Sequence, residues 1–215
     1  MPPALPYPFD HRKAVRHLRQ CHPRMEALIG KVGRFRLPLD QQASPYEALF
    51  RSILYQQLHG NAAAAILGRV KDQIGGGDFP RPAAMLAASD DALRAPGLSR
   101  QKIAALRDLA AKAEAGIVPG WEEIQHLPDG DIVARLTQVR GVGEWTVHML
   151  LIFRLGRPDV WPTLDYGVRH GYQIAFHKRR MPTPKELAKA GEPWRPYRSV
   201  AAWYFWQQVG LSRGD

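Results

Sequence analysis

The stretch that decides the fold runs from Leu136 to Phe153 and reads LTQVRGVGEWTVHMLLIF. Apolar residues recur at helical spacing on both sides of Gly141-Val142-Gly143, which predicts two helices joined by a short glycine turn. Because glycine adopts positive φ and leaves the backbone uncovered, the second helix begins with outward-facing amides, a natural phosphate site. The alternative is a glycine cap followed by a tight turn between two packed helices.

The composition favours a polyanionic partner. The chain has 215 residues, enough for one large domain or two small ones sharing a core. Its 30 Lys and Arg outnumber 20 Asp and Glu, which gives a formal net charge of +10. Nucleic acid is therefore the leading candidate partner, and a merely basic soluble protein is the alternative.

The single cysteine, Cys21, excludes an intrachain disulfide, a four-cysteine zinc site and a four-cysteine iron–sulfur cluster. We expect Cys21 to be a buried or partly buried structural thiol. The N-terminal MPPALPYPFD lacks the basic and apolar regions of a secretory signal, and no apolar run approaches the roughly 18 residues of a membrane span. We therefore expect a cytoplasmic protein, nucleoid-associated if bacterial, without membrane contact.

Strand signals are scarce and amphipathic stretches are many, which predicts an all-α fold of short helices. One helix begins with Ser44 as its cap, Pro45 in its first position and Glu47 three residues after the cap. The next has Asn61 as its cap and Gly75 as its stop. Further helices are expected within residues 9–21, 88–97, 98–116, 129–139, 165–176, 185–191 and 198–210.

Five stretches carry a resemblance to a known family. VRGVGEWT, residues 139–146, resembles the hairpin of the helix–hairpin–helix DNA glycosylase superfamily, and WPTLDYGVRHGY, residues 161–172, resembles its aspartate segment. YEALFRSILYQQLHGNAAAAILGRV resembles the helix that ends in a DNA-probing turn, and PGLSRQKIAALRDLAAKAEAG the helix pair before the hairpin. PWRPYRSVAAWYFWQQ resembles the C-terminal helix of the 3-methyladenine DNA glycosylase II branch. The motifs follow the family's order over residues 46–208.

The resemblance implies two helical subdomains with the active site in the cleft between them, and no N-terminal β-sheet domain of the kind some larger relatives carry. One subdomain is expected to comprise residues 1–50 and 157–215 and to carry the aspartate. The other, residues 51–156, is expected to be a helical bundle that carries the helix–hairpin–helix at residues 131–155.

The resemblance also implies a DNA glycosylase of base excision repair without lyase activity. Lyase relatives carry a nucleophilic lysine two residues after the second hairpin glycine, where this chain has Trp145. The expected substrates are 3-methyladenine and 7-methylguanine, whose positive charge makes them good leaving groups. The alternatives are a glycosylase for hypoxanthine, ethenoadenine or uracil, and a non-catalytic helix–hairpin–helix DNA-binding protein.

Asp165 follows Trp145 by 20 residues, which matches the family's spacing to its essential aspartate. We expect its carboxylate to stabilise an oxocarbenium-like sugar, although a helix N-cap is the other role of an aspartate here. Trp145 and Trp206 match the family's pocket aromatics, with core tryptophans as the alternative. Met149 stands where some relatives carry an aromatic residue, and Gln57 is expected to contact DNA or the pocket.

Leu58 lies at the turn where such enzymes insert an apolar wedge into DNA, and closing the helix against the core is its alternative role. By resemblance, the hairpin contacts the DNA backbone through Arg140, Gly141, Val142, Gly143 and Thr146. The resemblance also implies a monovalent cation, Na+ or K+, on the backbone carbonyls of Thr137, Val139 and Val142.

No cofactor is expected for catalysis, and neither zinc nor an iron–sulfur cluster. The expected partner is double-stranded DNA containing alkylated bases, and the protein is expected to be a monomer. Arg169 and the basic residues 178–180 are candidate phosphate contacts, with a solvated basic surface as the alternative. His148 and His170 are expected to be structural residues with satisfied polar atoms, since the histidines show no metal-ligand spacing.

Overall fold

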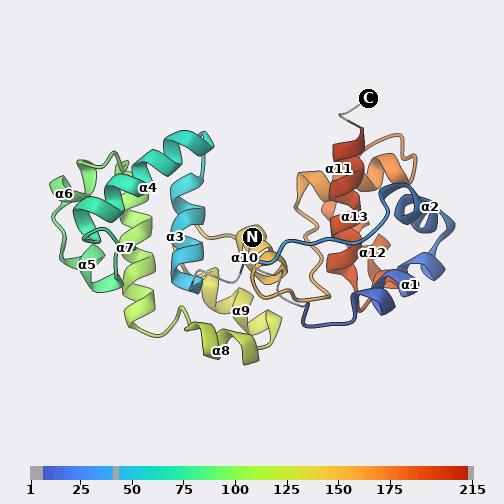
Figure 1. Cartoon of the computed structure of the whole chain (residues 1–215), viewed down its shortest axis with the longest axis horizontal. Coiled ribbons are helices and arrows are strands. Elements are labelled where there is room, and N and C mark those ends of the chain that lie inside the picture. Colours follow the sequence, from blue (N-terminus) through green and yellow to red (C-terminus); the bar gives the residue numbers. More distant parts are fainter. Residues whose placement is uncertain (1–6, 41–43, 213–215) are drawn as a thin grey trace. The chain divides into compact units, whose positions relative to one another are not determined.

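The computed structural model describes residues 7–40 and 44–212 (Figure 1). These residues form α-helices and one 3-10 helix, and they contain no β-strand, which confirms the all-α fold class. The chain divides into two compact units, Met1–Asp40 with Leu151–Asp215, and Gln41–Leu150. The first boundary precedes α3 (Pro45–Tyr55), because α3 packs against other helices of Gln41–Leu150. The division expected at residue 50 falls inside this helix.

The unit Gln41–Leu150 is built on α7 (Arg100–Glu114), which packs against both α3 and α5 (Pro82–Ala87). Phe50 and Leu54 of α3 and Leu106 and Leu109 of α7 are buried, so their apolar faces form this unit's core. The helices of this unit are α3 (Pro45–Tyr55), α4 (Gly60–Ile74), α5 (Pro82–Ala87), α6 (Asp90–Arg94), α7 (Arg100–Glu114), α8 (Trp121–His126), α9 (Asp129–Leu136) and the first part of α10 (Glu144–Phe153).

Local capping signals place some of these helices. The Ser44 hydroxyl accepts a hydrogen bond from the amide of Glu47 at 3.2 Å, which confirms the predicted start of α3. Gly75 ends α4 as predicted, and its amide donates to the carbonyl of Lys71 at 2.9 Å. The predicted cap Asn61 is wrong, because the helical backbone already begins after His59. Asn61 therefore lies inside the first turn.

The other unit is organised around its C-terminal helix, which is buried on most of its surface. Helix α11 (Tyr166–Ala175) packs against α13 (Arg198–Leu211) at very close range, since a Cβ atom on Gly171 would lie 2.0 Å from the carbonyl oxygen of Phe205. Only glycine permits this approach. The elements of this unit are α1 (His11–Cys21), α2 (Pro23–Val32), the end of α10, α11 (Tyr166–Ala175), α12 (Pro184–Ala190), the 3-10 helix η1 (Glu192–Trp194) and α13 (Arg198–Leu211).

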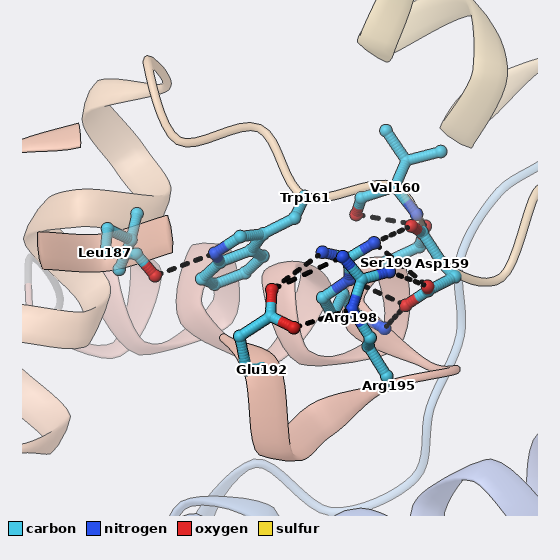
Figure 2. Close-up of polar contacts among 8 residues, drawn as sticks. All are labelled: Asp159, Val160, Trp161, Leu187, Glu192, Arg195, Arg198 and Ser199. Atoms are coloured by element: carbon cyan, nitrogen blue, oxygen red, sulfur yellow. Dashed lines mark hydrogen bonds and ion pairs between the residues drawn. The ribbon is translucent and has the colours of Figure 1, made fainter. Parts of the chain in front are cut away.

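A polar network fastens the segment before α11 to the start of α13 (Figure 2). Asp159 Oδ1 accepts a hydrogen bond from Arg198 Nε at 2.8 Å. The hydroxyl of Ser199 accepts one from the backbone amide of Val160 at 2.8 Å. The indole Nε1 of Trp161 donates to the carbonyl of Leu187 at 2.9 Å. The segment that leads to Asp165 is thereby held by side chains distant in sequence.

Cys21 is partly buried, as predicted. Its Sγ lies within hydrogen-bond distance of two carbonyl oxygens, those of His17 at 3.2 Å and Pro193 at 3.1 Å, which share its one S–H donor. Burial raises the pKa of the thiol. Within the described parts of the chain, no helix combines the length and apolar character needed to cross a membrane.

Candidate active site and nucleic-acid interface

Asp165 is a buried carboxylate at the N-terminus of α11. Its Oδ1 accepts from the amide of Val168 at 2.8 Å and from the indole Nε1 of Trp206 at 2.8 Å. The first bond is the N-cap that the sequence left as one alternative. The second bond comes from another helix and serves no cap, so Asp165 both begins α11 and is held in place from α13.

The indole of Trp206 is itself fixed from two further sides. Its ring stacks on Phe153 with centroids 5.3 Å apart and planes at 28°. A Cβ atom on Gly167 would lie 2.8 Å from Cδ1 of Trp206 and 3.2 Å from Oδ1 of Asp165. The glycine two residues after Asp165 therefore makes room for the indole, a contact that the sequence alone does not predict.

Two large apolar side chains flank the buried carboxylate and lie on the surface. Leu164 is 56% exposed and Tyr166 is 61% exposed, so they are available to a bound molecule. In the sequence, only their position on either side of Asp165 marks these two residues as candidate contacts. The ring of Tyr166 lies 5.5 Å from that of His170, whose Nδ1 is buried without a hydrogen-bond partner among the described residues. The expectation that His170 is fully satisfied is therefore wrong for this atom.

The predicted glycine turn connects α9 to α10 through residues 137–143. Gly141 has φ of +81°, and the amide of Val142 donates to the carbonyl of Val139 at 3.0 Å. Both valines are buried, whereas Arg140, Gly141 and Gly143 are exposed. The loop thus packs through its valines and presents the remaining backbone at the surface, as a phosphate site requires.

Asp108 of α7 holds this loop through a hydrogen bond that could not be expected from the sequence alone. Its Oδ2 accepts from the amide of Arg140 at 2.7 Å, and its Oδ1 pairs with the ammonium of Lys112. Burial opposes ionisation of this carboxyl, but the Arg140 amide and the Lys112 ammonium outweigh burial and hold the pKa of Asp108 below its ordinary value. Asp108 therefore acts as an ionised anchor for the hairpin loop.

The predicted DNA-probing turn follows α3. Gln57 has φ of +59°, a left-handed conformation that is uncommon outside glycine, and its side chain is exposed. Leu58 is 37% exposed, so it does not close the helix against the core, which was the alternative to a wedge. The wedge remains a prediction, and the geometry leaves Leu58 accessible to DNA.

The other candidate pocket residues lie on α10. Trp145 is 45% exposed, which excludes its alternative role as a core tryptophan. Met149 is half-buried and Thr146 is buried. Trp145, Thr146 and Met149 belong to the unit Gln41–Leu150, whereas Asp165 and Trp206 belong to the other unit.

The residues expected to hold a monovalent cation lie where a helix ends. Thr137 is the C-cap of α9, and Val139 and Val142 follow in the loop. Carbonyl oxygens at a helix C-terminus carry partial negative charge, and neutral oxygens suit hard cations, so this donor set fits Na+ or K+. Among the described residues, no cluster of three or more His, Cys, Asp or Glu side chains is placed to hold a metal ion.

The predicted basic contacts differ in their partners. Residues 178–180 are exposed and line a cavity of about 370 Å³. Arg180 pairs with Glu186 through two hydrogen bonds of 2.9 and 2.6 Å, and Arg169 Nε donates to the carbonyl of Pro182 at 2.9 Å. A phosphate at Arg180 therefore competes with Glu186. His148 lies 3.4 Å from Glu144, consistent with a structural role.

The chain is similar to several known proteins. A family model described as HhH-GPD superfamily base excision DNA repair protein matches residues 50–196. The chain is 38% identical over 201 residues to DNA-3-methyladenine glycosylase 1 of Schizosaccharomyces pombe, covering 93% of this chain and 88% of that protein. It is 28% identical to DNA-3-methyladenine glycosylase 2 of Escherichia coli, covering 89% and 68%.

Two solved structures are similar over nearly the whole chain. One is the 3-methyladenine DNA glycosylase of Schizosaccharomyces pombe in complex with abasic DNA, with a TM-score of 0.78 and 37% identity over 93% of this chain and 98% of that one. The other is a DNA-3-methyladenine glycosidase from Bacillus halodurans, with a TM-score of 0.85 and 31% identity over 94% and 91%.

Proposed function

The chain belongs to the HhH-GPD superfamily of base excision DNA repair proteins, and on this premise we propose that it is a DNA glycosylase for alkylated purines. It binds double-stranded DNA as a monomer, turns the damaged nucleotide out of the stack and releases 3-methyladenine or 7-methylguanine. An abasic site remains. The observation that carries the proposal is the buried Asp165 carboxylate held by Trp206.

Release of a base that is already cationic needs no general acid to protonate it, but it does need a carboxylate to stabilise the positive charge on the sugar. The bond between the sugar C1′ and the base nitrogen breaks with its electron pair going to the base, which neutralises the base's positive charge. The sugar becomes oxocarbenium-like, and the fixed Asp165 carboxylate stabilises that charge inside a partly dry site. Water then adds to C1′ and loses a proton, and Asp165 orients this water or accepts its proton.

The absence of a lyase step follows from the residue at the family's lysine position. Trp145 offers no amine there, so no Schiff base forms with the sugar. Its exposed indole instead suits a cationic base, which aromatic faces attract. Met149, one helical turn along α10, adds a polarizable side chain to the same helix face.

DNA is held by the hairpin and probed by the turn after α3. The exposed backbone at Gly141 and Gly143 receives a phosphate. The backbone carbonyls of Thr137, Val139 and Val142 would hold a Na+ or K+ ion, which would supply positive charge toward the same phosphate. Leu58 fills the gap left by the extruded nucleotide. Gln57 contacts the DNA beside it.

The test is base release from methylated DNA by the wild type, by Asp165→Asn and by Asp72→Asn, an exposed aspartate on α4 that serves as control. Free bases are separated by chromatography, and strand breaks are measured before and after alkali. The proposal requires release by wild type and control, loss of release in Asp165→Asn, and breaks only after alkali. Release of hypoxanthine, ethenoadenine or uracil from duplexes that carry these bases, with no release from methylated DNA, would overturn the alkylated-purine substrate. DNA binding without release of any of these bases would overturn catalysis.

A further inference from the structure

Lys102 of α7 closes the C-terminal end of α3. Its ammonium donates to the carbonyls of Ile53 at 2.9 Å, Leu54 at 2.8 Å and Gln56 at 2.9 Å. A lysine has three N–H donors, so all three are used here. The last carbonyls of a helix have no partner within the helix, and Lys102 supplies one for each of these. Lys102 therefore holds the backbone immediately before the turn that carries Leu58.

Gln56 links the C-terminal end of α3 to the hairpin loop. Its backbone carbonyl is held by Lys102, and its side-chain Nε2 donates to the carbonyl of Gly141 at 2.8 Å. Gly141 is the positive-φ residue of the hairpin loop, and Asp108 holds the neighbouring Arg140 amide. One helix, α7, thus fastens both loops, and Gln56 joins the loops directly.

We propose that Lys102 is a positioning residue that, through Gln56, couples the turn bearing Leu58 to the hairpin loop. This inference rests on the proposed function and deepens it. When a phosphate binds the hairpin, the linked turn is held at a set distance along the DNA, so Leu58 enters the duplex next to the same phosphate. Backbone binding and nucleotide extrusion then occur as one event, because the two loops move as one body.

A purely structural role makes a different prediction. Gln56 is exposed, so its side chain adds little to the core, and its loss leaves the fold intact. If the hydrogen bond from Gln56 to Gly141 is only a surface contact, its removal leaves the unstacking of DNA by the protein unchanged. If the bond couples the loops, the hairpin still binds phosphate but Leu58 no longer follows.

The test compares Gln56→Met, Lys102→Met and Lys102→Arg with wild type. Gln125→Met is the matched control, because Gln125 also donates its amide to a backbone carbonyl, that of Trp121 at 3.0 Å, but does so on α8. Each protein is titrated into a short duplex with 2-aminopurine beside a tetrahydrofuran abasic analogue. Fluorescence reports unstacking, affinity for an undamaged duplex reports backbone binding, and a melting curve reports folding.

We expect Gln56→Met to cut the fluorescence change about fivefold or more, by analogy with other lost positioning contacts, while affinity for undamaged DNA stays within about twofold. Lys102→Met should do the same, and Lys102→Arg, which keeps the donors, should restore at least half of the signal. The double variant Gln56→Met, Lys102→Met should lose no more than the worse single variant, because both break one coupling.

The proposal is overturned if Gln56→Met gives the wild-type signal, if the signal falls only in step with affinity for undamaged DNA, or if losses in the double variant multiply. The analogue has no base to release, so the result is independent of glycosylase chemistry. A wild type that unstacks 2-aminopurine but releases no base leaves the coupling standing and removes the proposed function.

Discussion

Trp206 donates its indole N–H to the Asp165 carboxylate at 2.8 Å across 41 positions of sequence. The bond joins the last helix of the chain to the residue that begins α11. A hydrogen bond to an ionised group is stronger than one between neutral groups, so it restricts the direction of the carboxylate as well as its position. Trp206 therefore has a second role besides the aromatic one expected from the sequence.

Trp206→Phe separates the two roles of this residue. Phenylalanine keeps an aromatic ring against Phe153 but cannot donate to Asp165, so the carboxylate keeps the amide of Val168 and loses the hydrogen bond from α13. We expect base release under single-turnover conditions to slow by about tenfold, equivalent to about 1.4 kcal/mol. Trp203→Phe, on the same helix, is the control and should leave the rate unchanged. Equal rates for Trp206→Phe and wild type would show that the ring alone matters.

Gly167→Ala tests the same pair from the opposite side. The new Cβ would lie 2.8 Å from Cδ1 of Trp206, so the indole must move away from Asp165. Because the obstacle is a side chain, we expect activity to fall about tenfold or more with a stability loss of about 1 kcal/mol. Gly171→Ala is the contrasting variant, since its Cβ meets the backbone carbonyl of Phe205 at 2.0 Å. That variant should lose about 3 kcal/mol or fail to fold.

Asp108 makes hairpin stability depend on pH. Its pKa is lower in the folded protein than in the unfolded chain, so ionised Asp108 stabilises the fold at neutral pH. This contribution is complete above the unfolded pKa of about 3.9 and disappears as pH falls through the lower folded value. We expect Asp108→Asn to lose about 1 kcal/mol at pH 7 in urea unfolding, and the difference from wild type to shrink below about pH 4.

The control is Asp131→Asn, an exposed acidic residue in the first turn of α9. A difference between wild type and Asp108→Asn that is constant from pH 7 down to about pH 3 would contradict the anchoring role, because a mere size or polarity effect does not titrate.

Local features of the fold could be predicted because their causes lie within a few residues. The Ser44 cap, the Gly75 stop and the turn at Gly141 each depend on adjacent side chains or on glycine's own backbone freedom. The cap at Asn61 was wrong because His59 and Gly60 begin the helix without a side-chain cap. Two six-residue helices, α5 and α8, were not expected, since so short a segment shows no clear periodicity.

The supports of the site could not be predicted, because their partners are distant in sequence. Lys102 donates hydrogen bonds to carbonyls that lie 46 to 49 positions away in the sequence. Asp108 accepts a hydrogen bond from a backbone amide 32 positions away. A lysine and an aspartate on an amphipathic helix resemble solvated residues until the packing of that helix is known. Spacing relative to a family motif pointed to Asp165 but gave no indication of the Trp206 hydrogen bond or of the space at Gly167.

Leu58→Ala distinguishes a wedge from a packing residue. A leucine packed in the core loses about 2–5 kcal/mol of stability when truncated to alanine. Leu58 is 37% exposed, so we expect its truncation to change the free energy of unfolding by less than about 1 kcal/mol. Base release should nevertheless slow by about tenfold, because nothing fills the gap in the duplex and the damaged nucleotide returns to the stack. Affinity for undamaged DNA should stay near wild type, since the phosphate contacts of the hairpin are unchanged. A large stability loss with normal base release per folded molecule would identify Leu58 as a packing residue and leave the gap to another side chain.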